Sequence, residues 1–93
     1  MPSPDKEVSG AYIGDLLSWV MGKAEPSNVW ITIMSNINTV AVASLTDVSC
    51  ILLADGVRAD GEIIETASAK GINILTTEGT AFETALKIKD AVR

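Results

Sequence analysis

Two short apolar runs rich in β-forming residues flank a segment with helical character near the middle of the chain. The runs are VWITIM at residues 29–34 and CILLA at residues 50–54. A parallel strand that is buried on both faces reads as a continuous apolar run, whereas a half-exposed strand alternates apolar and polar residues. The pattern therefore predicts a β-α-β unit with two parallel strands.

Four helices are indicated by residues that typically begin or end a helix. Asp, Asn and Thr side chains at an N-cap accept hydrogen bonds from the first turn, and Gly readily adopts the left-handed conformation that ends a helix. We expect the N-caps to be Asp15, Asn36 or Asn38, Asp60 and Thr80, with Gly71 ending the third helix and Thr80 to Glu83 forming a capping box. We expect the last helix to bury Phe82, Ala85, Leu86 and Val92.

The remaining segments complete an alternation of strands and helices. A short edge strand is expected within residues 8–13 and a third core strand at residues 72–75. The connections are long enough for right-handed crossovers between parallel strands. We therefore predict an α/β fold, a three-layer sandwich with a small, mainly parallel sheet and helices on both faces. The polar opening at residues 1–7 predicts a disordered tail, and residues 8–93 a single domain.

Composition excludes several classes of function. The 93 residues carry 7 Lys and Arg against 12 Asp and Glu, a net charge of −5, so we expect no binding to nucleic acid, which requires a basic surface. The opening residues lack the basic-then-apolar order of a signal peptide, and no apolar run in the sequence reaches membrane-spanning length. We expect a cytoplasmic protein without membrane association. A lone cysteine, Cys50, agrees with a reducing compartment.

Catalytic chemistry has few candidate residues in this chain. The sequence contains no His, and Cys50 lies inside an apolar strand, where a thiol is usually inert. No phosphate-binding loop of the Walker type occurs. Asp55, Asp60 and Glu62 could together hold Mg²⁺, but a cap and a first-turn acid explain the last two. We expect no metal, no cofactor and no enzymatic activity; an enzyme using Asp55, Arg58 and Glu78 is a weaker alternative.

Three loops are expected to meet at one edge of the sheet. In an open parallel sheet, ligands bind beyond the carboxyl ends of the strands, where helix N-termini present free N–H groups. These polar residues are also what helix starts and turns require, and capping alone is the simpler explanation of them. The candidate ligand-binding residues are Ser35, Asn36 and Asn38 in the first loop, Asp55, Gly56 and Arg58 in the second, and Thr76, Thr77 and Thr80 in the third.

A homodimer is the expected assembly. A small, apolar-rich chain has few ways to cover both sheet faces and the exposed sheet edge. Trp19 and Met21 lie on a different side of the first helix from Leu16, Leu17 and Val20, so Trp19 and Met21 are the candidate dimer contacts. Trp30, the second tryptophan, is expected in the core or in an interface.

The order and spacing of several motifs resemble the DRTGG domain family. They are Asp-Leu-Leu-Ser at 15–18, Ile-Thr at 31–32, Asn38 followed by Ala-Val-Ala at 41–43, Gly56, and the Thr-x-x-x-x-Phe segment that ends at Phe82. The likeness covers about residues 8–92. Where the family has its Asp-Arg and Thr-Gly-Gly residues, this chain has Ser35-Asn36-Ile37-Asn38 and Ala54-Asp55-Gly56.

The resemblance implies a module similar to the N-terminal domain of HPr kinase/phosphorylase. Such domains occur alone or fused to phosphotransacetylases and CBS-containing pyrophosphatases, where they are regulatory or dimer-forming. We therefore expect a non-catalytic regulatory module that acts by homo-oligomerisation or by docking a protein partner in a regulatory or metabolic system. The alternative is a small-molecule sensor that binds a nucleotide or other anion at the strand-end loops.

Overall fold

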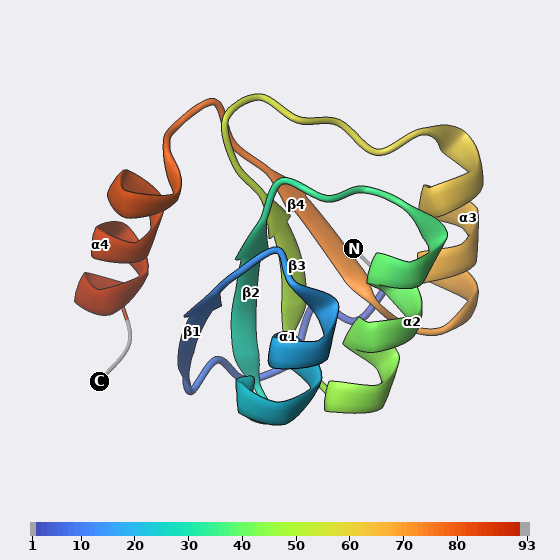
Figure 1. The fold of residues 1–93 in the computed structure, drawn as a ribbon, viewed down its shortest axis with the longest axis horizontal. Helices are drawn as coiled ribbons and strands as arrows, with labels where there is room; N and C mark the ends of the chain where they lie inside the picture. Colours follow the sequence, from blue (N-terminus) through green and yellow to red (C-terminus); the bar gives the residue numbers. More distant parts are fainter. Residues whose placement is uncertain (1, 92–93) are drawn as a thin grey trace.

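The structure is a computed structural model that describes residues 2–91. Within these residues the chain forms one sheet of parallel strands in the order β1-β2-β3-β4 (Figure 1). The strands are β1 (Gly10–Ile13), β2 (Asn28–Thr32), β3 (Cys50–Leu53) and β4 (Asn73–Thr76), and the helices are α1 (Leu17–Lys23), α2 (Ile37–Thr46), α3 (Gly61–Ala69) and α4 (Ala81–Ala91).

The helices divide unequally between the two faces of the sheet. Helix α1 packs beside α2 and α2 beside α3, whereas α4 contacts β1 and β2. Each right-handed crossover between neighbouring parallel strands places its helix on the same face. Consequently α1, α2 and α3 share one face, and α4 covers part of the other (Figure 1). The predicted α/β sandwich with helices on both faces is confirmed.

The continuous apolar runs are the central strands. Every residue of β2 is buried, from Asn28 to Thr32, and β3 is nearly so. Strand β2 pairs with β1 on one side and β3 on the other, and residues opposite each other share a face, as Ile31 and Leu52 do. One part of the core therefore lies under α1 to α3, and a smaller part lies under α4.

Trp30 belongs to the core rather than to an interface. Its side chain is fully buried among the residues under α1 to α3. Its indole Nε1–H donates to the Gly14 carbonyl oxygen at 2.9 Å. This bond satisfies the buried polar atom and holds the turn after β1 against β2.

Three of the four expected helix starts are capped as predicted. Asn36 and Thr39 form a reciprocal capping box at α2, and Asp60 accepts the Ile63 N–H at 3.0 Å. Thr80 and Glu83 exchange hydrogen bonds at α4. Of the two alternatives for α2, the cap is Asn36, and Asn38 lies within the helix.

The prediction that Asp15 caps the first helix is wrong. The N-cap of α1 is Leu16, which makes no side-chain cap bond. Asp15 instead accepts the Thr32 hydroxyl at 2.6 Å and the Ile33 N–H at 3.2 Å. Its carboxylate therefore ties the loop after β1 to the end of β2, because these strands are neighbours.

The predicted buried face of α4 is also partly wrong. Phe82 is 71% exposed and Leu86 is 48% exposed. The residues that pack on the sheet are Ala81, Ala85 and Ile88, together with the buried Thr84. Small side chains let this helix approach the sheet closely, which turns the larger ones aside. Val92, expected in the same face, lies outside the described residues.

Residues 2–7, predicted to be a disordered tail, form no helix or strand, but Ser3 is held beside β4. The Ser3 N–H donates to Asn73 Oδ1 at 2.8 Å, and the Asn73 amide donates to the Ser3 carbonyl oxygen at 2.8 Å. The Ser3 hydroxyl donates to the Gly71 carbonyl oxygen. These bonds place Pro2 next to the amino end of β4.

Candidate functional site

A tight turn follows β3 at one of the predicted loops. Asp55 and Gly56 have φ values of 57° and 74°, and the Val57 N–H donates to the Ala54 carbonyl oxygen at 3.2 Å. Two successive residues with positive φ are typical of a type I′ turn, for which Asp-Gly is a favoured pair. The sequence therefore specifies this loop locally.

Backbone hydrogen bonds join this turn to the loop after β4. The Asp55 N–H donates to the Gly79 carbonyl oxygen at 2.8 Å, and the Gly56 N–H donates to the Thr77 carbonyl oxygen at 2.9 Å. These N–H groups already have acceptors, so they are not free to bind an anion. Two of the three predicted loops are nonetheless brought side by side, as expected from the neighbouring strands.

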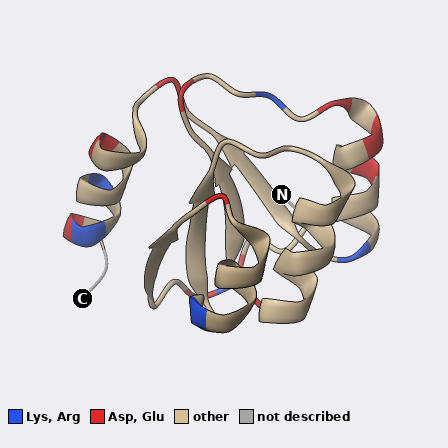
Figure 2. Ribbon diagram, viewed as in Figure 1, with Lys and Arg blue, Asp and Glu red and all other residues tan. Residues whose placement is uncertain are grey.

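Arg58 supplies the positive charge of this region. Its Nη1 donates to Thr76 Oγ1 at 3.2 Å, and its Nη2 lies 2.9 Å from Glu78 Oε1. Arg58 is the only Lys or Arg in the loops that follow the strands, residues 14–16, 33–36, 54–60 and 77–80. In Figure 2 the loop between β3 and α3 accordingly carries a basic segment among acidic ones. The two side chains of the pair are 68% and 79% exposed, so the ion pair contributes little stability.

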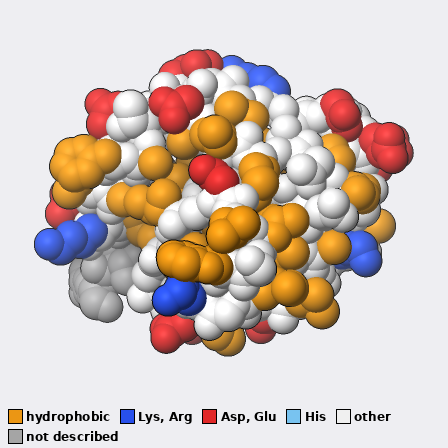
Figure 3. Space-filling view, viewed as in Figure 1, with side chains coloured by type: hydrophobic (Ala, Val, Ile, Leu, Met, Phe, Trp, Pro, Cys, Tyr) orange, Lys and Arg blue, Asp and Glu red, His pale blue; other side chains and the backbone are white. Residues whose placement is uncertain are grey.

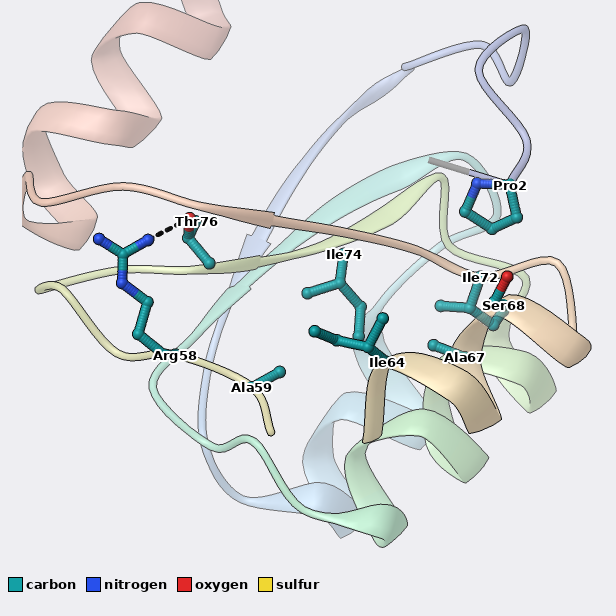
Figure 4. A pocket seen from close by; sticks show the side chains of 9 residues that line it. All are labelled: Pro2, Arg58, Ala59, Ile64, Ala67, Ser68, Ile72, Ile74 and Thr76. Carbon is teal, nitrogen blue, oxygen red and sulfur yellow. Dashed lines mark hydrogen bonds between the residues drawn. The ribbon is translucent and has the colours of Figure 1, made fainter. Parts of the chain in front are cut away.

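A pocket of about 520 Å³ opens beside Arg58, between α3 and β4. Figure 4 shows Arg58 and Thr76 at one end, Ile64 and Ile74 in the middle, and Pro2 and Ser68 at the other end. Its lining residues are Pro2, Arg58, Ala59, Ile64, Ala67, Ser68, Ile72, Ile74 and Thr76. The pocket is thus mainly apolar and has a cation at one end.

The first predicted loop, after β2, forms no hydrogen bond with this cluster within residues 2–91. Ser35 and Asn38 make no side-chain hydrogen bond within residues 2–91, and the Asn36 side chain is engaged by Thr39. Thr80 is likewise engaged by Glu83 as a helix cap. Of the nine candidate residues, Arg58 and Thr76 line the pocket, Asp55 and Gly56 form the adjoining turn, and Thr77 accepts the Gly56 N–H.

Sequence reasoning missed the apolar wall of the pocket. Ile63 and Ala67 of α3 are buried, whereas Ile64 is 52% exposed and lines the pocket. Periodicity assigns such residues to a core. It does not reveal that β4 is an edge strand, beside which the face of α3 is left uncovered. No signal in the sequence distinguishes these two environments.

Metal and thiol chemistry find no support in the described part of the chain. Residues 2–91 contain no group of three His, Cys, Asp or Glu side chains that could hold a metal ion, so Asp55, Asp60 and Glu62 do not converge. Burial raises the pKa of the Cys50 thiol to about 11, although Lys6 opposes the shift. The reactive thiolate is therefore scarce at neutral pH.

Helix α1 presents a separate apolar surface beside the β1 edge. Trp19 is 59% exposed and Met21 is 52% exposed, and Leu16, expected on the other side, is exposed as well. Lys23 Nζ lies 5.1 Å from the centroid of the Trp19 ring. Figure 3 shows hydrophobic side chains gathered over α1 and over α4 on the same face of the molecule. We call Leu16, Trp19 and Met21 the α1 surface.

Comparison with protein families gives one match, which spans most of the chain. The family described as the DRTGG domain matches residues 14–91. The chain belongs to the DRTGG domain family. This is a family of regulatory rather than catalytic domains, and membership confirms the resemblance stated above. No curated protein and no solved structure matches the chain. Among the described residues, no helix has the length and apolar character needed to cross a membrane.

Proposed function

We propose that this DRTGG domain is a non-catalytic regulatory module that acts by homodimerisation through the α1 surface. The observation that carries the proposal is the exposure of Trp19 and Met21 on a helix of seven residues. Large aromatic and Met side chains are enriched in protein interfaces and are often their main energetic contacts. An exposed group of this kind on a chain with only two Trp residues is a candidate contact.

The neighbouring edge of the sheet supports the same surface. Strand β1 is the edge strand beside β2, and Ile13 at its end is exposed. An edge strand presents unpaired N–H and C=O groups that favour association with another chain. A twofold dimer uses the same patch on both subunits, so one apolar surface suffices. A protein partner in a regulatory or metabolic system would be expected to dock on the same surface.

Molar mass in solution tests this proposal. Light scattering at tens of micromolar should give a dimer for the wild-type protein and a monomer for Trp19→Ala. Phe82→Ala is the matched control, because it removes an exposed aromatic ring from α4 instead of α1. A wild-type monomer, or a Trp19→Ala variant that remains a dimer, would contradict the proposed contact.

A second candidate function is the sensing of a nucleotide or other anion at the strand-end loops. The observation that favours it is the position of Arg58 where the loops after β3 and β4 meet. Asp55 and Glu78 oppose a highly charged ligand, so a weakly charged one fits better. Titration with a nucleoside monophosphate and with acetate, monitored by amide chemical shifts, should affect residues 55–60 and 76–81 for at least one of the two. Shifts confined to residues 27–29 would contradict it.

A further inference from the structure

We propose that the pocket between α3 and β4 binds a small monocarboxylate with an apolar body. Arg58 would hold the carboxylate, and the isoleucine-lined part of the pocket would hold the apolar body. The inference deepens the second candidate function and rests on it for the role of Arg58. It goes further in two ways. It names the chemical class of the ligand, and it assigns ligand contacts to residues of α3 and β4 that lie outside the strand-end loops.

The apolar lining of the pocket favours a ligand with an apolar body. Ile64 and Ala67 from α3 face Ile74 from β4 and Ile72 just before this strand, and Ala59 closes the side near the loop (Figure 4). The volume of about 520 Å³ lies within the range of pockets that enclose small organic ligands. Ile64 is 52% exposed and Ile74 is partly buried, so their apolar surface gains from covering by an apolar group, whereas Ala67 and Ile72 are already buried. A bare inorganic anion would leave this wall in water.

The guanidinium of Arg58 favours a ligand whose polar end is a carboxylate. Its Nη1 and Nη2 atoms bind Thr76 Oγ1 and the Glu78 carboxylate, so the guanidinium already holds a carboxylate in place. A planar guanidinium can bind a carboxylate through two parallel hydrogen bonds. The exposed pair with Glu78 is weak, so a ligand carboxylate can replace Glu78 at small cost.

The surrounding charges favour one negative charge over several. Arg58 is balanced by a single carboxylate, and the neighbouring Asp55, Asp60 and Glu78 repel further negative charge. The chain as a whole has a net charge of −5. A phosphate ester or triphosphate would therefore be disfavoured at this site.

Titration of the full chain with octanoate, below its critical micelle concentration, tests the assignment. Calorimetry should show octanoate binding at least tenfold more tightly than octanol, which lacks the charge, and acetate, which lacks the body. Amide shifts should move along residues 58–68 and 72–76. Inorganic phosphate should not compete with octanoate.

Substitutions at exposed positions then separate the two halves of the site. Arg58→Gln should weaken octanoate binding at least tenfold, and Ile64→Asp should weaken it to a similar extent. Glu78→Gln should strengthen binding severalfold, because it removes the competing carboxylate. Leu45→Asp is the matched control for Ile64→Asp, since it places the same charge at an exposed apolar position on α2, and it should leave binding unchanged.

Distinct results would overturn the inference. Absence of octanoate binding would refute it, as would binding that Arg58→Gln and Ile64→Asp both leave intact. Phosphate or ATP binding that needs Arg58 but not Ile64 would retain the second candidate function and refute the carboxylate site. Loss of a dimer in Ile64→Asp without octanoate binding would instead assign the pocket to a second copy of the chain. The α1 surface lies toward β1, at the other edge of the sheet from β4, so Trp19→Ala tests dimerisation separately.

Discussion

Gly56 occupies a backbone position that side-chain-bearing residues adopt poorly. Its φ is 74°, and it follows Asp55 at a φ of 57°. A Cβ atom built on Gly56 would lie 2.6 Å from Glu78 Oε2. Glu78 is long and exposed, so its end can move away, but the positive φ cannot be relieved without opening the turn. Backbone strain is therefore the main cost of a substitution here.

We predict that Gly56→Ala lowers the free energy of unfolding by about 1–2 kcal/mol, the usual cost of a left-handed conformation for a residue with a Cβ. Urea denaturation measures this change. Gly61→Ala is the control, because a Cβ at Gly61 meets no atom within 4 Å and its φ is not positive. If adding Glu78→Ala restored the stability of Gly56→Ala, the clash and not the strain would be the cause.

Asp15 and Asp60 show how far a single residue can be interpreted from sequence. Both precede an apolar helical face, and only Asp60 accepts a hydrogen bond from the first turn of its helix. Asp15 is drawn instead to Thr32, which belongs to the next strand. Whether such an Asp caps its own helix or bonds to a neighbouring strand depends on the order of the strands in the sheet. A local capping signal does not contain that information.

At the scale of the elements, α4 shows why strand and helix positions were easier to predict than helix faces. Its start and extent follow from the capping box and the apolar spacing. Its contact face does not, because Phe82 and Leu86 form one apolar stripe and Ala81, Ala85 and Ile88 form another. A helix that lies alone on a sheet face can bury the smaller stripe.

The capping box of α4 makes its stability depend on pH. The Thr80 N–H and then the Thr80 side chain stabilise the Glu83 carboxylate and lower its pKa from the ordinary 4.5. A lowered pKa in the folded state means that this contribution is present above pH 4.5 and is lost as the pH falls through the folded-state pKa. Below that pH the carboxyl is protonated in both states.

We predict that Glu83→Gln lowers the melting temperature at pH 7 and that the difference from wild type shrinks as the pH falls below 4.5. Thermal unfolding followed by circular dichroism across this range measures both. Glu65→Gln on α3 controls for the lost negative charge, and it should show neither effect. An equal difference at pH 7 and at pH 3 would mean that the charge of Glu83 plays no part.

At the scale of the whole molecule, the order of the strands decides what the loops can do. The parallel sheet was predictable from the apolar runs, and it correctly implied that the loops after β3 and β4 meet. The pocket beside them was not predictable. It exists because β4 is an edge strand and α3 leaves part of its face open, which depends on packing between elements far apart in sequence. The family match fixes the regulatory class without assigning a ligand.

Homodimerisation through the α1 surface would link folding to protein concentration. If the folded subunit is stabilised by association, a hundredfold rise in concentration adds about 2.7 kcal/mol per dimer. For a domain of this size we predict that the melting temperature rises by several degrees over that range. Trp19→Ala should abolish the dependence, while Phe82→Ala should keep it. A melting temperature that stays constant for the wild type would exclude a dimer over these concentrations, whereas a dependence that survives Trp19→Ala would move the contact away from α1.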